Sequence, residues 1–228
     1  MSLQQLVLNI SPDHEPSLAN YITGKNAEAL YAAQVLTKGR ALYLWGPKGS
    51  GKSHILRSLT RNKKTKYLNS TNCDEILNLA INNEMDFPTT IAMDDVHLLN
   101  NEQQSGLFSL YNRWRELSNT KKAFALILSG NNPPMLMNLR EDLRTRLGWD
   151  LSFRLEPLSD HDKLNALKLL ANNLGASNID NVIEWMLKYH DRDITSLTNL
   201  LVSLDKYSIA NKRPITIRLL RTMLKESD

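Results

Sequence analysis

One short segment constrains the fold more than any other: the glycine-rich run Gly46–Ser53, with the sequence GPKGSGKS. The apolar run Ala41–Trp45 precedes it, and a helical pattern starting near His54 follows it. Strand, glycine-rich loop and helix in this order are the context in which the motif G-x-x-x-x-G-K-[ST] binds phosphate. Glycines let the backbone curl so that several amides face one anion, and the positive end of the helix dipole adds to that field. The sequence therefore predicts a phosphate-binding loop.

The motif also predicts a role for individual residues. Lys52 can reach the β- and γ-phosphate oxygens of a nucleotide, and Ser53 can ligate Mg²⁺. The other expected nucleotide contacts in and after the loop are Pro47, Gly49, Ser50, Gly51 and His54. A segment just before such a loop often lies across the base, so Tyr21 and Ile22 are the candidates for that contact.

A second informative segment, Pro88–Asp95, is a mainly apolar run that ends in two carboxylates. A buried parallel strand with Asp at its carboxyl end is where a phosphate-loop NTPase places its metal-orienting acid. We therefore expect Asp94 to hold Mg²⁺ through water, and Asp95 to stand where the base that activates the attacking water belongs. Asn131 follows the next apolar strand, residues 123–129, and is a candidate sensor of the γ-phosphate or of that water.

Strand and helix patterns alternate through residues 17–156. This alternation predicts an α/β domain with a five-stranded, doubly wound parallel sheet and helices on both faces. Right-handed crossovers would bring the carboxyl ends of the strands to one edge, where the nucleotide binds. Only helical patterns follow, so residues 157–228 are expected to form a small all-α domain, with Ser159 and Asp162 capping its first helix.

The first sixteen residues differ from the rest. Leu6, Leu8 and Ile10 alternate with polar or smaller residues, and a turn-rich linker up to Pro16 follows them. This pattern fits an edge strand or an extended peptide that docks in a partner's groove. The position before a proline-containing linker favours the peptide.

Composition narrows the class of protein. With 42% hydrophobic and 23% charged residues, the 228-residue chain is typical of a soluble globular protein. No apolar run approaches ~18 residues and no signal-peptide pattern opens the chain, so we expect neither a membrane span nor secretion. The single cysteine, Cys73, fits the reducing cytoplasm, and we expect it exposed or half-buried on a helix. A net charge of +4 permits contact with nucleic acid. We nevertheless interpret the basic run Arg61–Lys66 primarily as a solvent-exposed loop.

Several motifs, in this order, resemble the DnaA-related AAA+ family. The segments that carry the resemblance are the phosphate-binding loop and residues 21–26, 94–97, 130–134 and 144–150. Three further segments are more similar to the short regulatory inactivators of DnaA, the Hda group, than to the initiator: residues 110–113, 157–167 and 215–217. The expected lack of the initiator's DNA-binding and helicase-loading domains points the same way. The resemblance implies an AAA+ core followed by a helical lid.

The resemblance also implies a function. A protein of this group would bind the sliding clamp (the β subunit of DNA polymerase III), meet DnaA in its ATP form, and stimulate hydrolysis of that ATP, which prevents re-initiation of chromosome replication. Gln5, Leu6 and Leu8 match the group's clamp-binding peptide, although Asn9 stands where Pro or an apolar residue is common. Arg146 matches the arginine finger that would act in trans, with an intramolecular salt bridge as the alternative.

The nucleotide of this chain, ADP or ATP with Mg²⁺, would then be a structural ligand. Thr195 occupies the position of the arginine found in most AAA+ lids, so we expect weak or no intrinsic ATPase activity. We expect a cytoplasmic protein that contacts DNA weakly or indirectly and does not contact a membrane. The sequence does not decide whether the protein forms a homo-oligomer. A stand-alone ATPase of the helicase-loader type and a DnaA-like initiator fragment are the alternatives.

Overall fold

The computed structural model describes residues 16–18, 21–81, 87–176, 178–191 and 193–226. The chain divides into two compact units, and the boundary lies between Pro157 and Leu158. Among the described helices, none combines the length and the apolar character that crossing a membrane requires.

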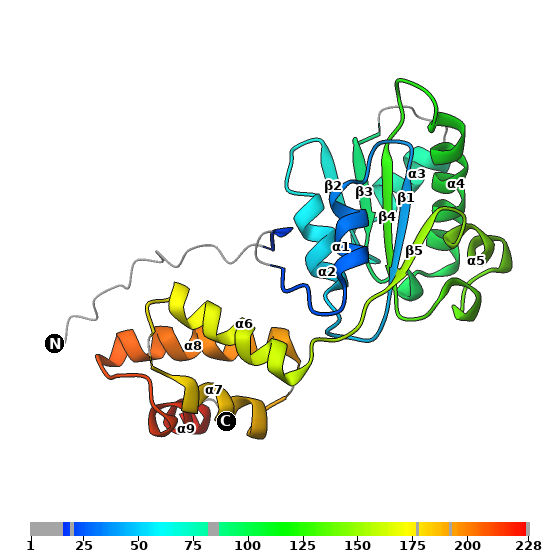
Figure 1. The fold of residues 1–228 in the computed structure, drawn as a ribbon. Coiled ribbons are helices and arrows are strands. Elements are labelled where there is room, and N and C mark those ends of the chain that lie inside the picture. Colours follow the sequence, from blue (N-terminus) through cyan, green and yellow to red (C-terminus); the bar gives the residue numbers. More distant parts are fainter. Residues whose placement is uncertain (1–15, 19–20, 82–86, 177, 192, 227–228) are drawn as a thin grey trace. The chain divides into compact units, whose positions relative to one another are not determined.

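The first unit contains a parallel sheet with the strand order β2-β3-β4-β1-β5 (Figure 1). Its strands are β1 (Ala41–Trp45), β2 (Thr65–Leu68), β3 (Thr90–Met93), β4 (Ala125–Gly130) and β5 (Leu151–Arg154). Every residue of β4 is buried, as expected for a central strand with helices on both faces. The predicted five-stranded α/β fold is therefore confirmed.

Helices cover both faces of this sheet, and β1 shows how (Figure 1). Leu42 and Leu44 pack on one face in a core shared with helices α1 (Ala27–Gln34) and α2 (Lys52–Leu59). Tyr43 points to the other face. That face is covered by α3 (Asp74–Ile81), α4 (Asn101–Leu117) and α5 (Glu141–Leu147). The alternation of β1 side chains follows from the two-residue period of a strand, so both faces of the sheet are apolar.

One expectation about a single side chain needs correction. Cys73, expected at or near the surface, is 0% exposed and belongs to the core between the sheet and α3. Asn26 lies directly before α1, and its side chain makes no capping hydrogen bond. Its amide instead pairs with the backbone of Glu156, donating to the carbonyl at 2.9 Å and accepting from the N–H at 2.8 Å. This pairing joins the start of α1 to the segment after β5.

The second unit is a bundle of helices. They are α6 (Asp160–Asn173), α7 (Asp180–Tyr189), α8 (Ile194–Asn211) and α9 (Ile217–Glu226). Residues such as Leu167, Ile183 and Leu201 are completely buried at its centre. At the start of α6, Ser159 Oγ accepts a hydrogen bond from the Asp162 N–H, and the Asp162 carboxylate accepts one in return, as the sequence predicts. The all-α fold of this unit is confirmed.

Candidate nucleotide site and arginine cluster

The glycine-rich loop connects the carboxyl end of β1 to α2 and needs glycine at defined positions. Gly49 and Gly51 have φ angles of 78° and 92°, in the left-handed region that other residues rarely adopt. A Cβ atom on Gly51 would also lie 2.8 Å from the Tyr21 ring, and one on Gly46 would lie 2.3 Å from the Leu155 carbonyl oxygen. At both positions a side chain would therefore collide with neighbouring atoms.

Two polar side chains in this loop could receive an anion. Lys52 is only 7% exposed, and its Nζ donates to the carbonyl oxygens of Gly46 at 2.8 Å and Pro47 at 2.9 Å. Burial lowers the pKa of Lys52, although the nearby carboxylates oppose this shift. Ser50 Oγ is buried and has no hydrogen-bond partner among the described residues. A buried hydroxyl without a partner is unusual, and a phosphate oxygen would supply one.

Asp94 lies at the end of β3 and is held by two hydroxyl groups. Tyr67 of β2 donates to its Oδ2 at 2.5 Å, and Ser129 of β4 donates to its Oδ1. Ser129 Oγ also accepts a hydrogen bond from the Asp95 N–H at 2.9 Å. The carboxylate is 3% exposed, so these donors replace water. Sequence reasoning missed both donors. A serine at the end of an otherwise apolar strand was the available signal for Ser129.

Asp95 and Asn131 lie at the same edge of the sheet but are less enclosed than Asp94. Burial, followed by the charge of Asp94, raises the pKa of Asp95, which makes its carboxylate a better proton acceptor. Asp95 has a φ of 49°, and its Oδ1 lies 3.9 Å from His97 Nδ1. Asn131 is exposed just after β4, two residues beyond Ser129, which is the β4 residue in contact with Asp94.

The residues expected near the base lie beside the loop. The Tyr21 ring contacts the ring of His54 edge-on, with centroids 5.4 Å apart, and its hydroxyl accepts from the Asn26 amide at 3.3 Å. His54 Nε2 lies 2.9 Å from the Ser17 carbonyl oxygen, so this nitrogen carries the proton. Ile22 is half-buried, and Ser53 is exposed in the first turn of α2. The structure thus places Tyr21 and His54 together against the loop.

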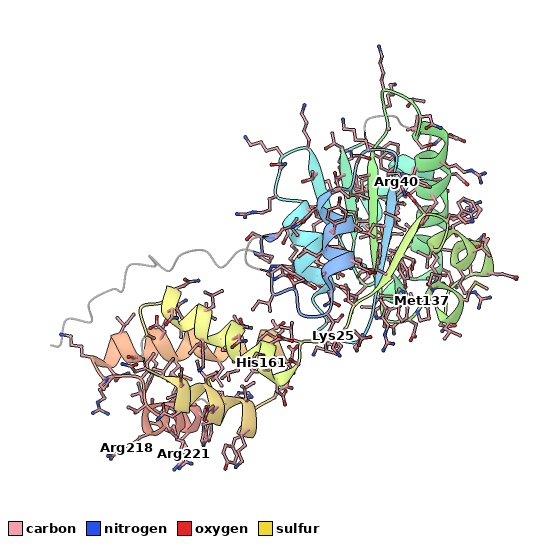
Figure 2. The ribbon with its side chains drawn as sticks, viewed as in Figure 1. Lys25, Arg40, Met137, His161, Arg218 and Arg221 are labelled. Atoms are coloured by element: carbon pink, nitrogen blue, oxygen red, sulfur yellow. The ribbon has the colours of Figure 1, made fainter. Side chains whose placement is uncertain are left out.

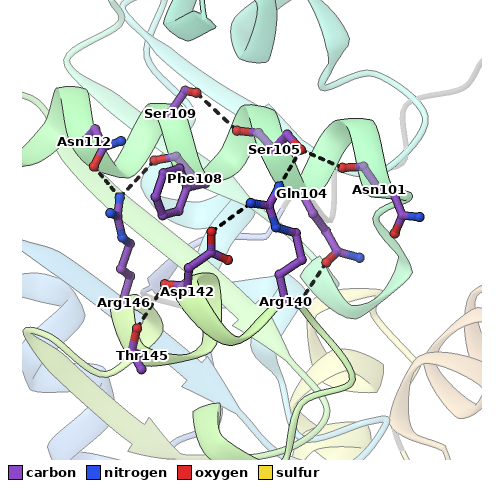
Figure 3. Close-up of polar contacts among 10 residues, drawn as sticks. All are labelled: Asn101, Gln104, Ser105, Phe108, Ser109, Asn112, Arg140, Asp142, Thr145 and Arg146. Atoms are coloured by element: carbon purple, nitrogen blue, oxygen red, sulfur yellow. Dashed lines mark hydrogen bonds and ion pairs between the residues drawn. The ribbon is translucent and has the colours of Figure 1, made fainter.

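Arg146 lies on α5 and contacts α4 of the same unit (Figure 3). Its Nη1 donates to the Phe108 carbonyl oxygen at 3.3 Å and to Asn112 Oδ1. The guanidinium carbon also lies 3.5 Å from the centroid of the Phe108 ring. Both of these acceptors are uncharged oxygens, whereas the alternative considered above was a salt bridge to a carboxylate. The Arg146 side chain is half-exposed.

Other arginines gather around the same aromatic rings. The guanidinium of Arg115 lies 4.8 Å, and that of Arg146 5.1 Å, from the centroid of Trp149, which is 44% exposed. Arg140 lies 5.8 Å from the Phe108 ring and pairs with Asp142. We call Arg115, Arg140 and Arg146 the arginine cluster. This cluster presents positive charge and aromatic surface together.

Known proteins match this chain in two ways: a sequence family matches the second unit, and solved structures match most of the chain. Residues 160–224 match the family model described as "Hda, lid domain". Domain III of the replication initiation protein DnaA from Thermotoga maritima has a similar structure: the TM-score is 0.72 and the identity 16%, over 94% of this chain and 97% of that chain.

Two longer proteins share the fold. DnaA from Aquifex aeolicus, in a structure with AMPPCP bound, gives a TM-score of 0.67 and 16% identity over 86% of this chain and 66% of that one. A variant of Thermotoga maritima RuvB gives a TM-score of 0.61 and 16% identity, over 92% of this chain and 72% of that one. At these identities the structures establish the fold alone, which is a unit with a five-stranded parallel sheet followed by a helical unit.

Proposed function

We propose that this chain, a DnaA-related AAA+ protein with an Hda-type lid, binds a nucleotide in its phosphate loop and stimulates hydrolysis of the ATP bound to DnaA. The observation that carries the proposal is the match of residues 160–224 to the Hda lid family on a chain whose fold is that of DnaA domain III. Such a regulator would act in the cytoplasm and prevent re-initiation of chromosome replication.

The loop geometry supports binding of ADP or ATP. Lys52 Nζ can exchange its two carbonyl acceptors for phosphate oxygens, which are charged and therefore stronger acceptors. The unpartnered hydroxyl of Ser50 can donate to the same phosphates. Tyr21 and His54 offer ring surface beside the loop for the remainder of the nucleotide.

The oxygen groups of this site suit Mg²⁺, which prefers hard oxygen donors and keeps several of its waters. Ser53 would supply a hydroxyl. Hydroxyl groups already donate to both carboxylate oxygens of Asp94. Asp94 would therefore accept a hydrogen bond from a metal-bound water and would not coordinate Mg²⁺ directly. Bound Mg²⁺ would neutralise phosphate charge.

Arg146 is our candidate for the group that acts on DnaA. Its present partners, a carbonyl oxygen and an amide oxygen, are uncharged, so exchange for the γ-phosphate of a neighbouring DnaA molecule would strengthen its hydrogen bonds. A guanidinium supplied in trans stabilises the charge of the transition state, and in related NTPases this raises the rate by about 10³- to 10⁵-fold. The finger role requires Arg146 to leave Asn112.

The proposed clamp contact rests on the sequence alone. Gln5, Leu6 and Leu8 lie outside the described residues. We propose that they fill the groove of the sliding clamp and so bring the protein to DnaA. The joint substitution Gln5→Ala and Leu6→Ala should abolish both clamp binding and clamp-dependent hydrolysis of DnaA-bound ATP. If both persist at the level of the unaltered protein, the clamp contact and the proposed route to DnaA are wrong.

One observation favours a second function. The raised pKa of Asp95, next to Asp94 and at the end of the sheet that bears the phosphate loop, suits a base for hydrolysis of this chain's own ATP. A stand-alone ATPase would turn over ATP without DnaA, and Asp95→Asn would stop it. ATP that stays intact on the isolated chain would remove this alternative.

A further inference from the structure

The end of the sheet away from the phosphate loop carries a concentration of positive charge. The turns that precede β1, β2 and β4 contain seven basic residues: Lys38, Arg40, Arg61, Lys63, Lys64, Lys121 and Lys122. Five of them are exposed lysines, and we call these the basic edge: Lys38, Lys63, Lys64, Lys121 and Lys122. Arg40 is paired with Asp150, so it contributes less to the field outside the protein.

Backbone hydrogen bonds bring these separate turns together. The Thr89 N–H donates to the Lys64 carbonyl oxygen at 2.7 Å, and the Ala125 N–H donates to Thr89 at 3.0 Å. The Gly39 N–H donates to the Phe124 carbonyl oxygen at 3.0 Å. The turns before β2, β3, β4 and β1 therefore lie side by side. Since neighbouring strands are about 4.8 Å apart, the row from β2 to β1 spans about 14 Å.

The figures show the same arrangement. The α2–β2 and α4–β4 connections lie at one end of the sheet in Figure 1. In Figure 2, long side chains tipped with nitrogen extend from that end, near the labelled Arg40. The phosphate loop leaves the opposite end, because it follows the carboxyl end of β1. A ligand on the basic edge would therefore not compete with a nucleotide.

The turns at this edge contain more basic than acidic residues. Counted in the sequence, the turns before the five strands hold seven basic residues and three acidic ones, Glu84, Asp86 and Asp150, an excess of four positive charges. This excess equals that of the whole chain, so the remainder of the chain is balanced in charge. Glu84 and Asp86 lie outside the described residues. Such a concentration attracts polyanions.

The surroundings favour phosphates over an acidic protein surface. A protein interface generally has an apolar centre. Among the described residues, the large apolar side chains exposed near these turns include Val35 at the end of α1, Ile81 at the end of α3 and Trp149 before β5. Val35 and Ile81 lie on helices that cover opposite faces of the sheet, and two guanidinium groups stack on Trp149, so these three side chains do not form one apolar patch. Lysine contacts with DNA phosphates need no such centre.

We propose that the basic edge binds the phosphate backbone of duplex DNA without regard to sequence. Duplex DNA carries one negative charge per about 1.7 Å of its axis, so about 14 Å of duplex presents about eight phosphates to the five lysines. The lysines are flexible point charges, which suit phosphate contacts but do not read bases. This inference is independent of the function proposed for the phosphate loop and Arg146.

The test measures binding of two unrelated short duplexes to the full chain by fluorescence anisotropy, over a series of salt concentrations. The edge variant combines Lys63→Gln, Lys64→Gln, Lys121→Gln and Lys122→Gln. A matched lid variant removes the same charge from exposed lysines of the second unit, through Lys188→Gln, Lys206→Gln, Lys212→Gln and Lys225→Gln. Circular dichroism and urea unfolding verify that both variants are folded.

We expect similar affinity for both duplexes and a Kd that rises steeply with salt. Each lysine–phosphate contact adds about 0.9 to the slope of log Kd against log salt, so the edge variant, which lacks four lysines, should lose about 3.6 from this slope and bind at least about tenfold more weakly. The lid variant should bind as the unaltered chain does. Equal losses in the two variants, an unchanged edge variant, or no binding of duplex even at low salt would overturn the proposal. In the last case an acidic protein surface becomes the better candidate.

Discussion

Replacing Tyr67 by Phe tests the carboxylate network at the centre of the candidate site. The substitution removes the hydroxyl that donates to Asp94 at 2.5 Å and leaves the ring in place. The guanidinium of Arg57, 4.7 Å from the ring centroid, can still stack on it. Asp94 then keeps Ser129 as its remaining side-chain donor. A hydrogen bond to a charged, buried acceptor contributes about 1.5–3 kcal/mol, so we expect the free energy of unfolding to fall by that amount.

Urea unfolding of the full chain, followed by tryptophan fluorescence, measures this loss, because both units contain tryptophan. Tyr207→Phe is a suitable control, because the Tyr207 hydroxyl donates to Glu226 at the surface, where water can replace it. We expect no measurable change there. In a double-mutant cycle, Tyr67→Phe should cost much less when Asp94 is already Asn, because the charged acceptor is gone. Equal costs in both backgrounds, or a loss no larger than that of the control, would refute the proposed network.

Three further predictions concern the loop. Gly51→Ala should destabilise the protein more than Gly175→Ala, by urea unfolding: both residues have positive φ, a strain of about 1–3 kcal/mol for alanine, but only the Cβ at position 51 meets the Tyr21 ring. Equal losses would contradict this. Lys52→Ala should weaken ADP binding by about 10- to 150-fold in calorimetry, the loss of a charged hydrogen bond of about 1.5–3 kcal/mol; unchanged affinity would exclude the loop as the site. Burial lowers the pKa of His54 below about 6.5, so protonation favours the unfolded chain. Stability should therefore fall as the pH drops from about 6.5 toward the lowered pKa, and His54→Gln should flatten that slope; an unchanged slope would show that His54 is not its source.

The sequence was most informative where structure depends on neighbouring residues. The positions of the glycine-rich loop and of Asp94 were predictable because each follows an apolar strand, and the apolar runs 41–45, 88–95 and 123–129 agree with β1, β3 and β4 to within a few residues. The cap formed by Ser159 was likewise predictable from residues three positions apart.

Contacts between distant segments could not be predicted in the same way. Tyr67 reaches Asp94 because β2 pairs with β3. The sequence of neither strand reveals which strand will be its neighbour in the sheet. Asn26 looks like a helix cap, but a backbone 130 positions away competes for its amide. The partners of Arg146 lie on α4, more than thirty positions earlier in the chain. The basic edge also depends on the sheet, because its lysines come from three separate turns.

The measurement that tests the central claim most directly is hydrolysis of DnaA-bound ATP in single turnover, with clamp loaded on DNA. Arg146→Ala should lower the stimulated rate by about 10³-fold or more while leaving binding to clamp and DnaA intact. Arg144→Ala is the matched control, because it lies two residues away on the same helix and its side chain points in a direction about 160° from that of Arg146. We predict that this control stimulates hydrolysis normally. Stimulation by the Arg146→Ala protein at the rate of the unaltered chain would contradict the claim that Arg146 acts on the ATP of DnaA.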